Sequence, residues 1–422
     1  MKILWFSNSP CGSIRRNSNK PIMGGWLISL EAAIKKIDNI ELSVAYFSDI
    51  AESDFVYEGV HYFPIYRNGH KNNHLLRILS RLSNLNKSDE KDKILLMDVV
   101  EKVKPDLIHI HGTEKSYGLL SLTNTKIPIV FSIQGLISSY LEKRYSGIPE
   151  NYLKKNNSLR DHLTFTTEQF NINNWEHNAN REISYLVKAK YILGRTFWDR
   201  DITLLFNKSR TYYQCEEILR SPFYSYKWDK KRTNGKFVIA STVSSGIYKG
   251  LETLLKAANA LKKYTDIDFE WRVIGVNPND RTFRIAQKYV KLNYQDINVK
   301  LLGRKDADDV VRVLLDTDVY CHVSHIENSP NSVCEAMILG LPIVATYAGG
   351  TASILENGKE GILVQDGDPY IMAGSIIDLY INEESARLFG KNARERALIR
   401  HNPQTIANSL FKIYQEIETD NK

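Results

Sequence analysis

The stretch from Val319 to Thr346 constrains the fold of this chain more than any other part of the sequence. Its two ends, VYCHVS and PIVAT, are apolar and rich in β-branched residues, which is typical of buried strands. Between them lie a loop and a helical segment that starts near Ser329 and Pro330. A strand, a loop, a helix and a second strand form the repeating unit of parallel sheets, so we expect an α/β fold.

Two carboxylates, Glu327 and Glu335, flank the start of this helix. Ser329 is a natural N-cap, so the first N–H groups of the helix, near Asn331 and Ser332, should point into the loop and offer an anion site. Glu335 lies more than one turn into the helix among apolar neighbours, where a carboxylate usually needs a partner. Alternatively, the first acid is a surface residue and the second bonds a neighbouring backbone group.

The alternation of strands and helices runs through the whole chain and changes character once. The strands expected in the first half are KILWFSN, ELSVAYFS, VHYFPIY, DLIHIHG, IPIVFSIQG and YILGRT. The basic, turn-like stretch SPFYSYKWDKKRTNG then precedes a new strand, KFVIAST, and we place the interdomain linker there. We therefore expect two Rossmann-like domains, at 1–228 and 229–400, whose parallel sheets face a cleft, and a C-terminal helix at 401–422 that crosses back to the first domain.

Composition and cysteine spacing exclude several classes of protein. With 422 residues, of which 43% are apolar and 25% charged, the chain is long enough for two full cores. It contains no run of about 18 apolar residues, and its first residues turn polar too soon for a signal peptide, so we expect a cytoplasmic protein. Cysteines without CxxC spacing predict neither a disulfide framework nor a zinc site. The Asp-x-Asp triplets at 266, 306, 316 and 366 are interpreted as solvated turns, so no metal is expected.

The first half of the chain carries the formal net charge of +7. Residues 1–230 hold 32 Lys and Arg against 25 Asp and Glu, whereas residues 231–422 hold 24 of each. Basic residues are densest between Arg67 and Lys93, where NNHLLRILSRLSNLNK fits an amphipathic helix. Such a helix either contacts the inner face of an anionic membrane or, more simply, covers its own domain in contact with solvent. No nucleic acid partner is expected, because no RNP-like, zinc-finger or helix-turn-helix pattern accompanies the charge.

Small, polar and basic residues follow the expected strands, at the edge where open α/β sheets bind their ligands. In the first half these are Gly24, Gly25, His111, Gln134 and Arg195, and in the second they are Ser244 to Lys249, Arg304 and Ser324 to Glu327. The paired glycines allow a backbone to approach a ligand closely, although an ordinary tight turn uses the same pair. Lys249 opposes the dipole of the helix that it starts, so either a bound diphosphate or simple exposure accounts for it.

The pattern EN-SPNSVCEAM-LG-PIVAT-AGG, preceded by GIYKG and VKLLGR and followed by EGILVQDGD, resembles the retaining glycosyltransferase family 4, which has the GT-B fold. The resemblance spans essentially the second half of the chain, and the first half matches more loosely through GGW, PDLIHIHG, SIQG and GRTFWD. It implies that Glu327 contacts the transferred sugar, that Glu335 bonds the ribose hydroxyls, and that Lys249 holds the diphosphate. The remaining donor contacts that it implies are Asn328, Ser329, Asn331, Ser332, Gly25, Ser244 and Arg304, and Gly24, His111, Gln134 and Arg195 are placed on the acceptor side.

The sequence departs from the family pattern at two positions. Ser244 stands where the family usually has an arginine that assists the lysine, and Arg304 or Arg195 are the candidates to replace it. Gln134 stands where the first domain of the family commonly has a histidine. These departures leave the expected fold unchanged but put individual donor contacts in question.

The resemblance implies a metal-independent transferase without a cofactor, which moves a sugar with retention from a nucleoside-diphosphate sugar, such as a UDP-sugar, to an acceptor hydroxyl. We expect an oligosaccharide or lipid-linked acceptor, in the assembly of cell-surface polysaccharide or glycolipid. A phosphorylase, which would consume inorganic phosphate, and an epimerase, which would need no acceptor, share the same plan. A non-catalytic nucleotide-sugar-binding protein is the alternative from another class, and the departures at Ser244 and Gln134 leave room for it.

Overall fold

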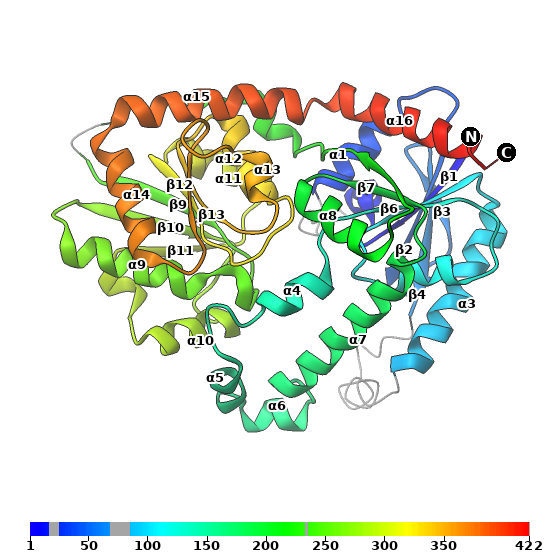
Figure 1. Ribbon diagram of the computed structural model, residues 1–422, viewed down its shortest axis with the longest axis horizontal. Helices are drawn as coiled ribbons and strands as arrows, with labels where there is room; N and C mark the ends of the chain where they lie inside the picture. The colour runs from blue at the N-terminus through cyan, green and yellow to red at the C-terminus, as the bar shows by residue number, and fades with distance from the viewer. Residues whose placement is uncertain (17–24, 68–84, 233–234, 422) are drawn as a thin grey trace. The chain divides into compact units, whose positions relative to one another are not determined.

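The chain folds into two compact units in the computed structural model, which describes residues 1–16, 25–67, 85–232 and 235–421 (Figure 1). Unit 1 comprises Met1–Leu141, Asn157–Ile218 and Asn402–Lys422, and unit 2 comprises Glu142–Asn156 and Leu219–His401. The boundary between Ile218 and Leu219 therefore comes ten residues earlier in the chain than the expected boundary after residue 228. Gly24 and most of the basic segment expected between Arg67 and Lys93 lie outside the described residues.

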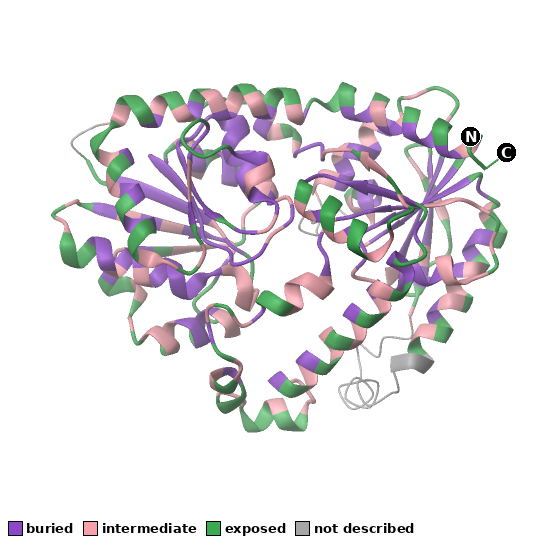
Figure 2. Cartoon of the chain, viewed as in Figure 1, coloured by how far each residue is buried: buried purple, intermediate pink, exposed green. Residues whose placement is uncertain are grey.

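Unit 1 is built on an eight-stranded sheet in the order β3-β4-β2-β1-β5-β6-β7-β8, in which only the β3–β4 pair is antiparallel. Its strands are β1 (Lys2–Ser7), β2 (Glu41–Ser48), β3 (Phe55–Tyr57), β4 (Val60–Tyr66), β5 (Leu107–His111), β6 (Ile129–Ser132), β7 (Tyr191–Gly194) and β8 (Thr211–Gln214). Helices cover both faces, which is why strands such as β1 are apolar and buried along almost their whole length (Figure 2).

The helices of unit 1 form two separate cores with the sheet. They are η1 (Cys11–Arg16), α1 (Gly25–Ile34), α3 (Leu85–Val103), η2 (Ser116–Leu122), α4 (Ile137–Lys143), α6 (Leu159–Leu163), α7 (Glu168–Leu186), α8 (Phe197–Phe206) and α16 (Pro403–Thr419). α1 and α16 pack on one face, and α3, η2, α7 and α8 contribute to the core on the other (Figure 1). The last helix is tied in by Tyr414, whose hydroxyl accepts from Trp5 Nε1 (3.0 Å) and lies 2.6 Å from His109 Nδ1.

Unit 2 contains a fully parallel six-stranded sheet in the order β11-β10-β9-β12-β13-β14. Its strands are β9 (Phe237–Thr242), β10 (Phe269–Ile274), β11 (Val299–Gly303), β12 (Val319–His322), β13 (Ile343–Tyr347) and β14 (Ile362–Gln365). Its helices are α5 (Glu150–Lys155), η3 (Ser221–Ser225), η4 (Ile247–Lys249), α9 (Leu251–Tyr264), α10 (Arg281–Val290), η5 (Tyr294–Ile297), α11 (Ala307–Leu315), α12 (Asn331–Leu339), α13 (Thr351–Ile354), α14 (Pro369–Ile381) and α15 (Glu383–Arg400). The expectation of two Rossmann-like units with parallel sheets is confirmed.

Strand order fixes where each unit can hold a ligand. In unit 2 the chain builds β9, β10 and β11 outward in one direction and β12, β13 and β14 in the other, so β9 and β12 meet at a switch point. In unit 1 the corresponding neighbours are β1 and β5. Loops leave the carboxyl ends of such neighbouring strands in opposite directions and open a crevice there, which is where open α/β sheets bind ligands.

Two segments outside the expected strands and helices, one of them the expected linker, contribute to the core of unit 2. The stretch interpreted as an interdomain linker is anchored by Trp228, whose backbone N donates to Leu339 O (2.7 Å) and whose Nε1 donates to Thr317 O (2.7 Å). Glu142–Asn156, which lies between elements of unit 1 in the sequence, buries Ile148 and Leu153 in the core beside α9. Buried apolar side chains on short helical segments therefore decided the boundary, and the turn-like composition of the linker was misleading.

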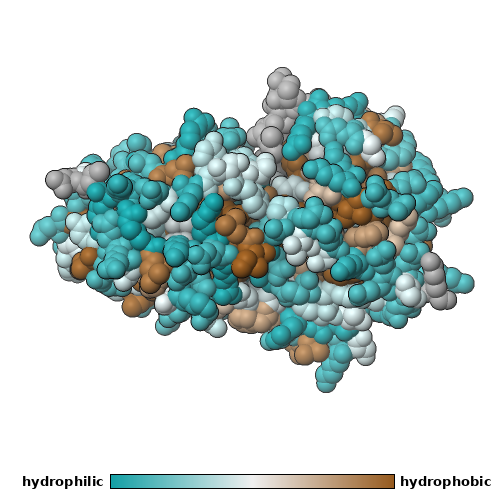
Figure 3. All heavy atoms as spheres, turned by 90° about the horizontal axis from the view of Figure 1, so that it is seen from above, coloured by the Kyte–Doolittle hydropathy of each residue, from teal (hydrophilic) through white to brown (hydrophobic). Residues whose placement is uncertain are grey.

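None of the described helices is long and apolar enough to cross a bilayer. On the face seen in Figure 3 most exposed residues are hydrophilic, and the apolar ones stand in small separate groups. Scattered apolar residues of this kind are usual on folded proteins.

Candidate active site

The loops after β9 and β12 touch at the switch point of unit 2. Gly250, between η4 and α9, has φ of 73°, and a Cβ atom built there would lie 1.8 Å from Val323 O. Only glycine allows this approach, because any side chain would displace one of the two loops. The backbone of His325 then donates to Tyr248 O (2.8 Å), which fixes the turn after β12 against η4.

This contact brings together, as an ion pair, Lys249 and Glu327, two of the candidates that the sequence offered for a donor site. Lys249 Nζ donates to Glu327 Oε1, which also accepts from Ser324 Oγ (3.2 Å). Both side chains are largely sheltered from solvent. Burial lowers the pKa of Lys249, but the charge of Glu327 outweighs burial and raises it above its usual value. Lys249 is therefore a fixed positive charge at the carboxyl edge of the sheet.

The turn that carries Glu327 is held by its backbone as well. Gly350 N donates to Glu327 O (2.9 Å), and Thr346 Oγ1 donates to Ser324 O (2.6 Å). Gly349 has φ of 56°, and a Cβ there would lie 2.0 Å from Glu327 O, so the chain after β13 also needs glycine to come this close. Glu327 thus has a defined direction before any ligand arrives.

Glu335 lies in α12, buried among apolar residues, and the structure supplies the partner that such a carboxylate requires. Arg220 donates from Nε to Oε1 (2.6 Å) and from Nη2 to Oε2 (2.8 Å), a two-pronged contact typical of arginine and carboxylate. Burial raises the pKa of Glu335, and Arg220 counteracts part of that rise. Sequence reasoning missed Arg220, which stands directly before the stretch interpreted as a linker and follows none of the expected strands. The only signal for such a residue in the sequence was that the buried carboxylate of Glu335 needs a positively charged partner.

The start of α12 differs by one residue from the expectation. Pro330, and not Ser329, occupies the N-cap position, and no side chain caps the helix. Proline stands there because it lacks an N–H and its carbonyl can accept from the next turn, at 2.9 Å from Val333 N and 3.2 Å from Cys334 N. The amides of Asn331 and Ser332 precede the intrahelical ladder and so remain the groups suited to an anion.

The other candidate donor residues share the carboxyl edge of the sheet in unit 2, with one exception. Ser244 and Arg304 are exposed after β9 and β11, whereas Asn328 is fully buried in the turn after Glu327. Gly25 is the first residue of α1 in unit 1. Among the described residues, no hydrogen bond or ion pair joins Arg304 to Lys249 or Glu327. The arginine bound within the candidate site is Arg220, which holds Glu335.

In unit 1 the candidates His111, Gln134 and Arg195 follow three neighbouring strands, β5, β6 and β7. His111 is buried against Trp5, with ring centroids 4.5 Å apart, and burial holds its pKa well below the usual value, so the ring is neutral. The guanidinium of Arg195 lies 4.2 Å from the ring centroid of Trp26, which in turn lies 6.0 Å from the His111 ring. The structure therefore brings His111 and Arg195 around Trp26, a residue that the sequence did not single out.

Glu114 is a second group of this edge that sequence reasoning missed. It follows β5 by three residues and accepts from Asn8 Nδ2 (2.9 Å). Burial raises its pKa to about 7, and the nearby charge of Glu182 adds to the rise. A carboxyl group that titrates near neutrality at a strand end is a functional candidate on physical grounds.

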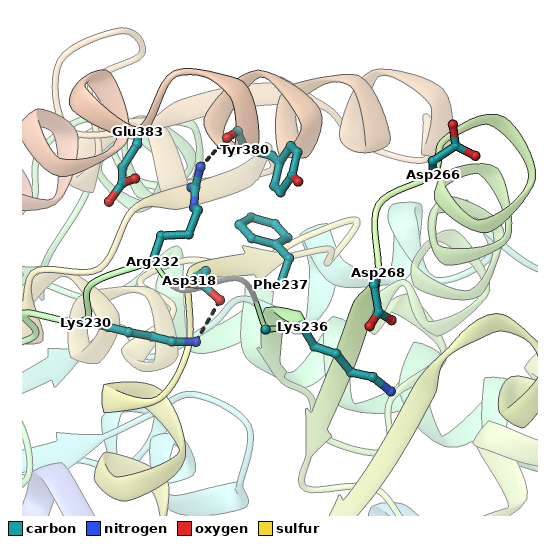
Figure 4. Close-up of a pocket in the computed structure, with 10 residues that line it drawn as sticks. Lys230, Arg232, Lys236, Phe237, Asp266, Asp268, Asp318, Tyr380 and Glu383 are labelled. Carbon is teal, nitrogen blue, oxygen red and sulfur yellow. Dashed lines mark hydrogen bonds and ion pairs between the residues drawn. The ribbon is translucent and has the colours of Figure 1, made fainter.

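In three of the four Asp-x-Asp triplets, those at 306, 316 and 366, an aspartate caps a helix or forms an ion pair. Asp306 caps α11 by accepting from Asp309 N (2.8 Å), and Asp368 caps α14 by accepting from Tyr370 N (2.9 Å). Asp318 pairs with Lys230 at 2.7 Å in a hollow of about 470 Å³ at the amino end of β9 (Figure 4). Arg232 in the same hollow donates to Leu379 O (3.1 Å) at the end of α14, so its charged groups hold elements together.

Comparison with known proteins agrees with the geometry of unit 2. A family model described as glycosyl transferases group 1 matches residues 225–396, which include Lys249, Glu327 and Glu335. The putative colanic acid biosynthesis glycosyltransferase WcaL of Salmonella typhimurium is 28% identical over 176 residues, or 40% of this chain and 42% of WcaL. N-acetyl-alpha-D-glucosaminyl L-malate synthase of Bacillus anthracis is 23% identical over 335 residues, or 78% of this chain and 79% of that protein.

Solved structures extend the similarity of fold to nearly the whole chain. Sucrose-phosphate synthase from Thermosynechococcus elongatus superposes with a TM-score of 0.74 at 14% identity and covers 99% of both chains. Anabaena HepE in complex with UDP and glucose gives a TM-score of 0.65 at 16% identity, over 98% of this chain and 99% of that one. The expected GT-B fold is confirmed by these neighbours. Residues 225–396, which form most of unit 2, match the model of the group 1 glycosyl transferases.

Proposed function

We propose that the chain transfers a sugar from a nucleoside-diphosphate sugar to an acceptor hydroxyl, with retention at the anomeric carbon and without a metal. The observation that carries the proposal is the Lys249–Glu327 pair at the switch point of a group 1 glycosyl transferase domain. Breaking the bond to the anomeric carbon builds positive charge on the sugar and negative charge on the diphosphate. A site for this reaction needs fixed groups of both signs at one place, and the pair provides them.

Lys249 and the start of α12 would stabilise the negative charge of the leaving diphosphate. The diphosphate would take over the ammonium group that Glu327 holds in the ligand-free protein, and the amides of Asn331 and Ser332 would add the positive end of the helix dipole. Glu327, freed from Lys249, would then orient the sugar beside the developing cation. Ser324 Oγ donates to the same carboxylate (3.2 Å) and would still direct Glu327 after Lys249 has left it, which suits an orienting role. Retention then follows from attack on the same face, with the departing phosphate accepting the proton of the acceptor hydroxyl.

The nucleoside is assigned to Glu335. A carboxylate offers about four lone-pair directions, and Arg220 uses two of them, so Glu335 can still accept from two ribose hydroxyls. Arg220 lowers the pKa of this buried carboxyl group, against the rise that burial causes, and so favours the ionised form that accepts hydrogen bonds. UDP is the first nucleotide to test, since HepE has been solved with UDP and with UDP-glucose.

The acceptor is assigned to unit 1, where His111, Gln134 and Arg195 share one edge of the sheet. The excess positive charge of residues 1–230 favours an acceptor that carries phosphate, such as a lipid-linked oligosaccharide. We place the reaction in cell-surface polysaccharide or glycolipid assembly at the cytoplasmic side of the membrane, with peripheral contact through unit 1. The relative WcaL, named for colanic acid biosynthesis, supports this class of acceptor.

Thermal denaturation with UDP, GDP, ADP and CMP, on the wild type and on Glu335→Ala, tests the donor site. One nucleotide should raise the melting temperature of the wild type, and the increase should be lost in Glu335→Ala, because a ligand of the native state stabilises it by mass action. Release of that nucleotide from its sugar ester should proceed in the presence of EDTA. The absence of a shift with all four nucleotides would overturn the proposal, and turnover that EDTA abolishes and Mn²⁺ restores would overturn the metal-independent mechanism.

A non-catalytic nucleotide-sugar-binding protein remains the second candidate, on the ground that Ser244 and Gln134 replace two residues of the family pattern. The same measurements separate the two. A melting-temperature shift without any release of nucleotide from its sugar ester during long incubation would favour the binding protein.

A further inference from the structure

The turn that carries Glu327 has a second attachment, which the proposed chemistry does not use. The side chain of His325 points into the body of unit 2, where Nε2 lies 2.7 Å from Glu252 Oε1 on α9. On the other side of the ring, Nδ1 lies 3.4 Å from Asp366 Oδ2, just after β14. His325 and Glu252 are completely buried, with side chains 0% and 1% exposed. Three elements of unit 2 therefore meet at one imidazole ring.

The position of the ring between two carboxylates favours its charged form. Nε2 is within hydrogen-bond distance of Glu252, and the 3.4 Å contact of Nδ1 with Asp366 is an ion pair and not a hydrogen bond. A neutral imidazole has a single N–H and could donate to only one of the two carboxylates, leaving the other oxygen facing a lone pair. An imidazolium donates from both nitrogens and balances part of the buried negative charge. Burial alone lowers the pKa of His325, but Asp366 and Glu252 outweigh burial and raise it to about 9. Lys143 is the other charged group near this cluster, and it acts on Asp366.

The segment Glu142–Asn156 covers the contact between His325 and Glu252, whereas the side chain of Asp366 is 21% exposed. A Cβ atom built on Gly147 would lie 2.1 Å from Glu252 Oε1 and 2.5 Å from His325 Nε2, so the backbone at Gly147 passes directly over this contact. Ile148 is buried in the core beside α9 and holds the segment in place. Hydrogen bonds and ion pairs are stronger in such a dry environment than at the surface.

We propose that His325 is a positioning residue, whose imidazolium, held between Glu252 and Asp366, fixes the turn Ser324–Glu327 and so directs Glu327 toward Lys249 and the transferred sugar. The turn is then anchored twice, by the backbone of His325 on Tyr248 O and by its side chain on α9. The effect on turnover rests on the proposed function, whereas the effect on the turn itself does not.

The test compares His325→Gln with His61→Gln, a matched control in which a histidine 3.1 Å from Asp54 is lost from an exposed pair of unit 1. The substrates are UDP-glucose, GDP-glucose and ADP-glucose, and released nucleotide is measured. We expect His325→Gln to lower kcat about 10- to 100-fold with KM for the donor changed less than about threefold, because misplacement of a reacting group by about 1 Å has effects of this size. His61→Gln should match the wild type. An equal kcat in His325→Gln and the wild type would refute the proposal.

The pH profile separates positioning from a general loss of structure. In the wild type, kcat should fall as pH rises through about 9, where the imidazolium loses its proton. Lys249, whose pKa is raised above its ordinary value of 10.5, would titrate at higher pH. Asp366→Asn removes one carboxylate and keeps the Glu252 contact, so the variant should stay folded and its alkaline limb should move to lower pH. If the alkaline limb of the Asp366→Asn profile lay at the same pH as in the wild type, the proposed role of the His325 imidazolium would be contradicted.

Hydrogen exchange of the ligand-free protein tests the turn without any substrate. Amides of residues 324–327 should exchange faster in His325→Gln than in the wild type, and at the wild-type rate in His61→Gln. Unchanged protection would overturn the proposal even if none of the sugar nucleotides is turned over. Absence of turnover in the wild type together with faster exchange in His325→Gln would instead reject the proposed function and retain the positioning role.

Discussion

At the scale of single residues, the site of unit 2 consists of charges that satisfy one another before a ligand binds. Lys249 is held by Glu327, and Glu335 is held by Arg220. Such pairs keep each group ionised and directed, because a lone charge in a sheltered position would shift its pKa or turn toward solvent. In the proposed reaction, the diphosphate and the ribose would bind to groups that are already in place.

Replacement of Lys249 by alanine should lower kcat/KM for the donor about 10²- to 10³-fold, because it removes a fixed positive charge from the leaving group. Release of nucleotide from the sugar ester measures the effect. Lys35→Ala is the control, since Lys35 forms a lysine–glutamate pair with Glu58 at 2.6 Å on the surface of unit 1, and it should leave turnover unchanged. A Lys249→Ala variant with wild-type turnover would show that the diphosphate is held elsewhere.

Replacement of Arg220 by alanine should destabilise the protein in a pH-dependent way. Without its partner, Glu335 remains buried, and its pKa, which burial already raises, rises further. A folded state that binds a proton more tightly than the unfolded state loses stability as pH rises through the window above the ordinary glutamate pKa of 4.5.

The loss of stability in Arg220→Ala should therefore be larger at pH 8 than at pH 5. At pH 8 we expect on the order of 2 kcal/mol, less than for a fully buried pair because Arg220 is partly exposed. Urea denaturation at the two pH values measures it. Equal losses at both would mean that Glu335 finds another partner, and Glu335→Gln in the same background should remove the pH dependence.

At the scale of elements, glycines with left-handed φ allow loops to meet where side chains would keep them apart. Gly250→Ala should destabilise unit 2 by about 1–3 kcal/mol and reduce turnover, because φ of 73° is strained for alanine and its Cβ would meet Val323 O. Gly374→Ala in α14 is the matched control. It has open space around the added Cβ and should be neutral or stabilise the helix by up to about 1 kcal/mol. Thermal denaturation and nucleotide release test both variants, and equal behaviour of the two would contradict the assigned role of Gly250.

The sequence predicted elements well where a strand is buried on both faces and poorly where a short segment is decided by a distant partner. Strands such as Lys2–Ser7 and Val319–His322 read as continuous apolar runs and are where they were expected. The edge strand Phe55–Tyr57 is too short for such a signal. The segment Glu142–Asn156 was missed because its few apolar residues find their core on α9, which is far away in the sequence.

In the candidate site, too, residues in local sequence patterns could be predicted, and contacts between distant segments could not. Glu327, Lys249 and Glu335 stand in local patterns of strand end and helix start, so their neighbourhood could be derived from spacing alone. Arg220 and Glu335 are 115 positions apart, and His325 meets Glu252 across 73 positions, so only the fold reveals these partners. The helix start at Pro330 was displaced by one residue because serine and proline both favour that region, and the carbonyl geometry decides between them.

At the scale of the whole molecule, the chain passes repeatedly between the two units. It leaves unit 1 for Glu142–Asn156, returns to it, builds unit 2 from Leu219 to His401, and ends again in unit 1 with α16. The two units have separate cores, and the residues assigned to the diphosphate and the ribose all stand in unit 2. Loss of the last helix should therefore affect one unit more than the other.

Deletion of residues 402–422 should destabilise unit 1 and leave nucleotide binding by unit 2 intact. α16 buries several apolar side chains against unit 1, among them Leu410 and Ile417, and each contributes about 1.5–3 kcal/mol, so their sum is comparable to the stability of a domain. Tyr414→Phe keeps this packing and leaves only Trp5 Nε1 and His109 Nδ1 without their partner, so it should have a smaller effect, about 1–3 kcal/mol. Calorimetry with and without UDP separates the units, because UDP should raise only the transition of unit 2. If the deletion abolished the UDP-sensitive transition as well, the stability of unit 2 would depend on α16. The prediction that unit 2 binds the nucleotide independently of α16 would then be wrong.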